Sequence, residues 1–304
     1  MIAWLGMSRC VADELRLDLV AVDGGGCTIS EMESRNKRRE RRTRPWWWWL
    51  YQPYKWLVVG PVLVTSTLVA GGTAVALSLV LSPRRVGALC GVPWARLNAG
   101  ATPMAVEVVG REHLERGRSY VVVANHQSLY DILLVYGWLG IDFRWVMKKE
   151  LRGVPGLGAS CERMGHIFVD RSSPIAASRT LEAARARVAE GASVLFFPEG
   201  TRSPDGTLGP FKRGAFRMAI DLGLPVLPMT IIGTRAILPP GSRDLRPGRA
   251  RLVIHPPIST DGWSLDRLSE LVERTRAAIA PPLAAGGEQR PDASRPAAPA
   301  VRTS

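Results

Sequence analysis

The chain has 304 residues and a formal net charge of +13 at pH 7, so we expect a polyanionic partner: nucleic acid, an anionic membrane surface or a phosphorylated substrate. Its four cysteines lack C-x-x-C spacing and its four histidines lack the spacing of zinc ligands, so neither a disulfide framework nor a metal site is indicated. The sequence also lacks the signatures of nucleoside triphosphatases, dinucleotide-binding enzymes and G-x-S-x-G hydrolases, and we expect no cofactor.

The first 55 residues divide into two segments. Residues 1–34 carry no clear pattern, lack the arrangement of a signal peptide and are treated as an uncertain N-terminal extension. Met32 is a candidate alternative start, which a native peptide from residues 1–31 would exclude. Residues 35–55 combine the basic run RNKRRERRTR with four consecutive tryptophans, a composition typical of the headgroup zone of a membrane. The alternative is a disordered basic arm, or an arm whose aromatic rings stack on nucleic acid.

Residues 56–83 contain no charged side chain and are rich in Val, Leu, Ala and Thr. About 20 apolar residues suffice to cross the hydrocarbon core as a helix, so this segment is predicted to be membrane-embedded. Basic residues flank both of its ends, and positive charge normally marks the cytoplasmic side. Two topologies are therefore open: a single span, or a re-entrant hairpin that breaks at Gly71-Gly72 with both ends cytoplasmic. A nucleic-acid arm leaves the apolar segment unexplained, so we do not expect nucleic acid as a partner.

Residues 84–280 are predicted to form the main folded domain, because apolar β-rich runs alternate with helical patterns and this alternation favours a layered α/β fold. The predicted strands are 106–109, 120–124, 143–147, 166–170, 193–197, 225–232 and 251–254. The clearest predicted helices are 130–139, 174–190, 211–222 and 264–280. Residues 281–304 are rich in Pro, Ala and Gly, and we interpret them as a disordered tail.

The segment NHQSLYD, residues 125–131, lies between a predicted strand and a predicted helix. Such turns present reactive side chains in a cleft. His126 is the residue type best suited to act as a base near neutral pH, and the carboxylate of Asp131 can fix its tautomer if the two side chains meet. The alternative is structural, because Ser128 and Asp131 also fit a helix N-cap with an acidic first turn.

The segment FPEGTRS, residues 197–203, follows another predicted strand. Its glycine frees the backbone, and its hydroxyls and arginine suit a phosphate, so the segment fits an anion cradle. A plain polar turn leading into a helix is the alternative. Two weaker segments are GHIFVDR, residues 165–171, whose His166 is interpreted as a packing residue, and a basic strand-end pair that includes Lys149.

Together these segments resemble the glycerolipid acyltransferase family that includes the 1-acyl-glycerol-3-phosphate acyltransferases. The family's N-H-x-S-x-x-D motif matches residues 125–131, and its F-P-E-G-T-R-S motif matches residues 197–203 without change. A G-x-I-F-I-D-R motif matches residues 165–171 with Val169 as a mild departure, and an apolar stretch around a proline matches residues 226–230. The four motifs occur in the family's order.

The resemblance implies an α/β fold with a mixed central sheet flanked by helices, preceded by an N-terminal membrane-embedded helical segment. It implies that His126 deprotonates the acceptor hydroxyl, that Asp131 orients His126, and that no acyl-enzyme forms. The acyl chain is expected in an apolar groove entered from the bilayer. The expected residues of the acceptor-phosphate region are Arg171, Glu199, Gly200, Thr201, Arg202 and, as a weaker candidate, Lys149.

The reaction so implied moves a fatty acyl group from acyl-CoA or acyl-carrier protein to the sn-2 hydroxyl of 1-acyl-glycerol-3-phosphate, giving phosphatidate in phospholipid synthesis. Another acceptor is also open: a different lysophospholipid, a lyso-aminolipid or glycerol 3-phosphate. A further alternative is a non-catalytic lipid-binding protein of the membrane, which the intact motifs disfavour. The expected location is a membrane, with the catalytic domain on the cytoplasmic face and held there by anionic lipids.

Overall fold

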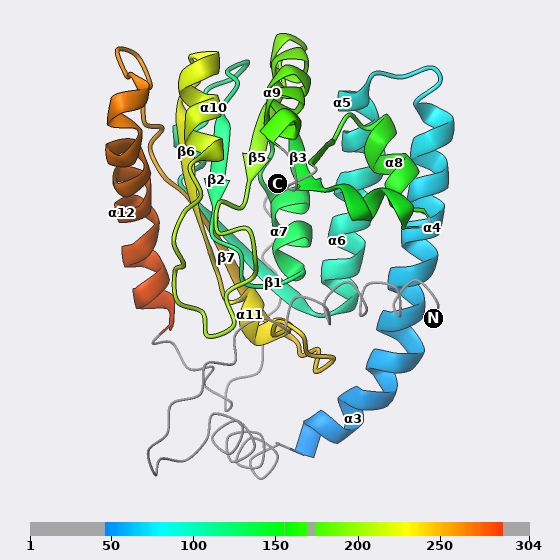
Figure 1. Ribbon diagram of the computed structural model, residues 1–304. Coiled ribbons are helices and arrows are strands. Elements are labelled where there is room, and N and C mark those ends of the chain that lie inside the picture. The colour runs from blue at the N-terminus through cyan, green and yellow to red at the C-terminus, as the bar shows by residue number, and fades with distance from the viewer. Residues whose placement is uncertain (1–45, 155, 170–173, 288–304) are drawn as a thin grey trace, which may run out of the picture.

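A seven-stranded sheet forms the centre of the protein in the computed structural model, which describes residues 46–154, 156–169 and 174–287 (Figure 1). The strands are β1 (Met104–Val109), β2 (Val121–Ala124), β3 (Phe143–Lys148), β4 (Ile167–Val169), β5 (Ser193–Phe196), β6 (Val226–Ile232) and β7 (Gly248–Ile254). They lie in the order β1-β7-β6-β2-β5-β3-β4. All neighbouring strands are parallel except β6 and β7, so the predicted mixed sheet is confirmed.

Helices cover both faces of this sheet, because its central strands are apolar on both sides. In β2, Val121 and Val123 belong to one core cluster while Val122 and Ala124 belong to another, as the two-residue period of a strand requires. One face is covered by α6 (Val92–Ala101), α7 (Tyr130–Trp138) and α11 (Thr234–Ile237), and the other by α9 (Pro174–Ala189), α10 (Gly214–Leu222) and α12 (Leu268–Gly287).

The N-terminal helices form a hairpin that packs against the catalytic domain (Figure 1). Its first arm is one continuous helical stretch made of α3 (Trp46–Tyr54), a π-helical segment (Lys55–Val59) and α4 (Gly60–Leu77). The second arm runs through α5 (Pro83–Val86), another π-helical segment (Gly87–Gly91) and α6. The two arms are joined by a hydrogen bond from the indole of Trp94 to the Thr67 hydroxyl (2.9 Å).

The hairpin does not turn at Gly71-Gly72, where the sequence suggested that the helix could break. The helix α4 continues through Gly71 and Gly72, and the chain reverses at residues 78–82. A Cβ atom on Gly71 would lie 2.2 Å from the carbonyl oxygen of Gly156, whereas one on Gly72 would meet open space. Gly71 therefore lets the backbone of α4 approach the loop before α8 (Gly158–Arg163) instead of breaking the helix.

The first arm contains a stretch of 30 helical residues, Trp48–Leu77, which is long and apolar enough to cross a membrane by its length and composition. Most of this stretch is not buried in the protein. Large apolar side chains on both arms are exposed: Trp49, Leu50, Trp56, Leu57, Val58, Leu68, Val69, Leu79, Val80, Leu89 and Leu97. The outer surface of the hairpin is therefore apolar.

The ends of several elements differ from the predicted ones. Each of the seven predicted strands is present, with small shifts at its ends, and the four predicted helices correspond to α7, α9, α10 and α12. The sequence did not predict α6, α8 or α11. The helix α12 extends past the predicted start of the tail to Gly287, and Leu283 within it is buried. Residues 288–304 lie outside the described part of the chain.

Candidate active site

The side chains of His126 and Asp131 meet where β2 passes into α7. The Nδ1 atom of His126 lies 2.7 Å from Asp131 Oδ2. A carboxylate only accepts hydrogen bonds, so Nδ1 carries a proton, and Nε2 is the ring nitrogen that can act as the base. The side chain of Asp131 is fully buried, whereas that of His126 is 16% exposed. This arrangement presents one basic nitrogen at the surface of a cleft.

Three further donors hold the carboxylate of Asp131. Its Oδ2 atom accepts the backbone N–H groups of Gln127 (2.7 Å) and Ser128 (2.9 Å), and Oδ1 accepts the hydroxyl of Thr234. Thr234 begins α11, after β6, and lies outside the segments that the sequence singled out. No sequence pattern pointed to it, because a threonine after a strand is common. Fully paired in this way, the carboxylate has a single orientation toward His126.

The hydroxyl of Ser128 is engaged elsewhere. It donates to the carbonyl oxygen of Leu238 (2.7 Å) and accepts the backbone N–H of Tyr130 (3.1 Å). Ser128 is fully buried. The N-cap of α7 is Leu129, without a capping side-chain bond, so Ser128 is not the cap that the sequence left open. Its buried and bonded hydroxyl is unavailable as a nucleophile.

The loop after β5 is tied directly to the backbone of His126. The carboxylate of Glu199 accepts the N–H of His126 (2.8 Å) and the N–H of Gly209 (2.9 Å), and the N–H of Ser203 donates to the carbonyl oxygen of His126 (2.9 Å). Burial raises the pKa of Glu199, against the opposing effect of these two backbone donors. Both carboxylate oxygens are thus used to brace the loops, a geometry that favours a positioning role over direct contact with a phosphate.

An aromatic ring fixes the plane of the imidazole. The ring of Phe197 stacks on His126 at a centroid distance of 4.0 Å and an interplanar angle of 6°. The indole of Trp145 packs against Phe197 at a centroid distance of 5.4 Å. Nearby, the side-chain amide of Asn125 exchanges two hydrogen bonds with the backbone of Ile231 (2.9 and 2.7 Å), which ties the end of β2 to β6.

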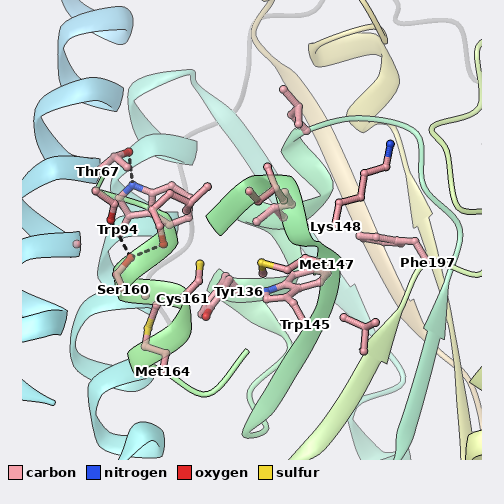
Figure 2. A pocket seen from close by; sticks show the side chains of 18 of the residues that line it. Thr67, Trp94, Tyr136, Trp145, Met147, Lys148, Ser160, Cys161, Met164 and Phe197 are labelled. Atoms are coloured by element: carbon pink, nitrogen blue, oxygen red, sulfur yellow. Dashed lines mark hydrogen bonds between the residues drawn. The ribbon is translucent and has the colours of Figure 1, made fainter. Parts of the chain in front are cut away.

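A cavity of about 340 Å³ extends from His126 between the hairpin and the catalytic domain. Figure 2 shows Lys148 and Phe197 at one end, Tyr136, Trp145 and Met147 along it, and Cys161 and Met164 at the other end. Its apolar lining comes from α4, α6, α7, α8, β3 and the segments beside them: Ala70, Gly71, Ala74, Cys90, Gly91, Trp94, Leu129, Ile132, Tyr136, Trp145, Val146, Met147, Leu151, Leu157, Met164 and Phe196.

The polar end of this cavity contains several of the residues expected near a phosphate. Gly200, Thr201 and Arg202 line it together with His126. Lys148 lines it as well, whereas the predicted candidate Lys149 is exposed and is not part of the lining. The family resemblance implied Lys149 as a weaker candidate, and the lysine that lines the cavity is Lys148, the last residue of β3. Arg171 lies outside the described residues.

His166 lies away from His126, beside the cavity wall. Its Nε2 atom contacts the hydroxyl of Tyr136, and its Nδ1 atom accepts the backbone N–H of Trp145 (3.2 Å). It is buried, and burial, together with the positive charges of Arg144 and Arg187, lowers its pKa to about 3. A neutral, doubly paired imidazole fits the packing role expected of His166.

Part of the chain is similar to known acyltransferases. Residues 105–232 match the family model described as Acyltransferase. The chain is 43% identical over 139 residues to the chloroplastic 1-acyl-sn-glycerol-3-phosphate acyltransferase BAT2 of Brassica napus, covering 45% of this chain and 40% of that protein. It is 36% identical over 191 residues to a 1-acyl-sn-glycerol-3-phosphate acyltransferase of Chlamydomonas reinhardtii, covering 62% and 57%. The chain thus spans about half the length of these relatives.

A solved structure covers more of the chain. The crystal structure of the 1-acyl-sn-glycerophosphate acyltransferase PlsC from Thermotoga maritima superposes with a TM-score of 0.66 at 28% identity, over 77% of this chain and 97% of that one. The resemblance that the four motifs predicted is therefore confirmed.

Proposed function

We propose that the protein moves a fatty acyl group from a thioester donor to the free hydroxyl of 1-acyl-glycerol-3-phosphate, giving phosphatidate. The match of residues 105–232 to the Acyltransferase family model supports this reaction. The observation that carries this proposal is the His126–Asp131 pair at the polar end of an otherwise apolar cavity. The relatives named above, which are called acyltransferases for this acceptor, support it.

In this mechanism Nε2 of His126 takes the proton of the acceptor hydroxyl as its oxygen attacks the thioester carbonyl carbon. Asp131 stabilises the imidazolium that results, at a hydrogen-bond distance of 2.7 Å. Collapse of the tetrahedral intermediate breaks the carbon–sulfur bond, and the imidazolium returns its proton to the departing thiolate. Because Ser128 is buried and bonded to Leu238, the acyl group passes directly from donor to acceptor.

We assign the acyl chain of the donor to the apolar cavity and the phosphate of the acceptor to its polar end. An apolar chain removed from water is stabilised in proportion to the area buried, which suits the aliphatic and aromatic lining. Arg202, Lys148 and Thr201 supply positive charge and a hydroxyl for the phosphate, and Arg171 and Lys149 are further candidates from the sequence. Gly200 leaves room for the phosphate to approach the backbone, and Glu199 acts by holding the two loops together.

The proposed location is a membrane surface, with the catalytic domain on the cytoplasmic face. Support comes from the exposed apolar side chains of the hairpin and from the excess of basic residues in the chain. The acyl cavity lies directly beneath α4 and α6, so a lipid substrate would travel only a short way from the bilayer to His126.

The test is acyl transfer by membranes containing the protein, with membranes that lack it as the control. Labelled acyl-CoA and labelled acyl-carrier protein are each offered with lysophosphatidate, lysophosphatidylcholine or glycerol 3-phosphate. We expect phosphatidate from lysophosphatidate with at least one donor. We expect little product from lysophosphatidylcholine, whose headgroup has no net charge. Product from another acceptor in place of lysophosphatidate would overturn the assigned acceptor, and no transfer from either donor to any acceptor would overturn the reaction.

A further inference from the structure

A second hollow, which we call the arginine hollow, lies at the opposite end of the sheet from His126. It has a volume of about 440 Å³. It is lined by Arg84, Arg111, Leu114, Glu115, Arg116, Gly117, Arg118, Leu139, Gly140, Ile141, Asp142 and Gly191. Apart from Arg84, these residues belong to the segments that precede β2, β3 and β5, at the amino ends of the parallel strands, whereas His126 follows the carboxyl end of β2.

The charge of this hollow is not balanced by its own carboxylates. Glu115 is paired with Arg118, and Asp142 is paired with Arg144, which lies outside the lining. Arg111 donates to the carbonyl oxygen of Trp138.

Two arginines are left with unused donors. Within the part of the chain that the structure describes, the side chains of Arg84 and Arg116 make no hydrogen bond or ion pair, and both residues are exposed. A guanidinium presents five N–H groups and binds phosphate in a forked geometry. The hollow therefore offers its free donors to an anion that the chain itself does not provide.

The tip of the helical hairpin adjoins this hollow. Arg84 lies in α5, directly after the turn at residues 78–82. Two neighbouring apolar side chains at that turn are almost fully exposed, Leu79 at 74% and Val80 at 79%. An apolar tip beside cationic side chains is the arrangement that inserts apolar groups below the phosphates of a bilayer while the cations stay among them.

We propose that the arginine hollow binds the phosphate of an anionic phospholipid in the bilayer, while Leu79 and Val80 insert beside it. The site is separate from the active site and does not depend on acyl transfer. A soluble phosphate compound is disfavoured as the occupant because the apolar tip would remain exposed to water beside it. The hollow thus gives the membrane a contact at the hairpin tip, in addition to the aromatic residues of the first arm.

The experiment places a fluorescent label beside the hollow. Glu112 is exposed and adjoins the lining, so Glu112→Cys is labelled in a full-length chain whose Cys10 and Cys27 are replaced with Ser; Cys90 and Cys161 are buried. Quenching of the label is followed as vesicles with a headgroup quencher are added. The vesicles contain phosphatidylcholine alone or phosphatidylcholine mixed with phosphatidylglycerol, and soluble glycerol 3-phosphate is tested as a competitor.

We expect quenching by the phosphatidylglycerol vesicles and little by phosphatidylcholine alone. A double variant that carries both Arg84→Gln and Arg116→Gln should raise the lipid concentration needed for half-quenching about 30-fold. The matched pair Arg179→Gln and Arg274→Gln removes the same charge from exposed positions on α9 and α12, and it should leave quenching nearly unchanged. Equal losses in the two pairs, equal quenching by both vesicles, or full reversal by glycerol 3-phosphate would overturn the proposal.

Discussion

The cavity has two walls that are built by different means. The catalytic wall consists of the segments 125–131 and 197–203, and directed hydrogen bonds hold the groups around His126, as the four donors to Asp131 show. The hairpin wall consists of α4 and α6, and close packing holds it, with few polar contacts such as that between Trp94 and Thr67. Directed bonds need particular residue types at fixed spacing, whereas packing accepts many apolar residues of suitable size.

This difference predicts that small chemical changes in the catalytic wall reduce the rate, while small changes of volume in the hairpin wall reduce stability. Among variants that keep His126, the largest effect is expected for Asp131→Asn, which keeps the size of the side chain but removes the anionic acceptor that fixes the tautomer of His126. We expect kcat to fall by about 10³-fold or more, measured as phosphatidate formation.

The control for this variant is Asp205→Asn. Asp205 lies in the loop between β5 and α10. It accepts hydrogen bonds from Ser203 and Thr207 and does not bond to His126. We expect its kcat to stay close to wild type. Similar losses in the two variants would show that the loops merely need their carboxylates for structure.

A smaller loss is expected for Thr234→Val, which removes one of the donors to Asp131 without changing the volume of the site. A hydrogen bond to a charged group contributes about 1.5–3 kcal/mol, so kcat should fall about tenfold to a hundredfold. KM for both substrates should change little, because Thr234 does not line the cavity. Thr234→Ser keeps the hydroxyl and should recover most of the rate; equal rates for the Val and Ser variants would argue against this role.

In the hairpin wall, two adjacent glycines provide a matched test. Gly71→Ala forces α4 away from the carbonyl of Gly156 and should lower the free energy of unfolding by about 1–3 kcal/mol. Gly72→Ala meets open space and should raise it by up to about 1 kcal/mol, because alanine favours the helix. Unfolding in detergent, followed by tryptophan fluorescence, measures both. Equal shifts would mean that α4 does not lie against this loop.

A further effect concerns the dependence of stability on pH, through His166 at the side of the cavity. Its folded-state pKa is lowered to about 3 from an ordinary value of 6.5. Between these values the unfolded chain binds a proton that the folded chain does not, so the free energy of unfolding should fall as pH drops, by about 1.4 kcal/mol per pH unit. His166→Gln should flatten this slope in denaturant titrations from pH 6.5 downward. An unchanged slope would contradict the buried, neutral imidazole.

The same contrast explains what the sequence could predict. The segments 125–131 and 197–203 appear as motifs because hydrogen-bonding geometry restricts their residues, and the strands appear as apolar runs because both faces of the sheet are buried. The second arm of the hairpin left no comparable pattern, since α6 mixes small, apolar and polar residues and gains its partners only when α4 and α7 surround it. Thr234 was missed for the same reason, because its partner Asp131 is distant in sequence.

The two lysines near the polar end of the cavity show where prediction from the sequence stops. The sequence identified the basic pair Lys148-Lys149, but only the fold shows that Lys148, the last residue of β3, lines the cavity while Lys149 is exposed. Lys149 begins the 3-10 helix that follows β3, so the chain changes direction between the two lysines. The sequence predicted that basic residues lie near the site, but the fold was needed to identify the lysine that lines the cavity.

The most direct test of the account compares two histidines. His126→Ala removes the proposed base, whereas His113→Ala removes a partly buried histidine that bonds to the carbonyl of Ile254 and lies outside the cavity. Both variants are assayed for transfer of a labelled acyl group to lysophosphatidate. The account predicts that product falls to the background of membranes without the protein in His126→Ala and is retained in His113→Ala. Product formed by His126→Ala at the wild-type rate would contradict it.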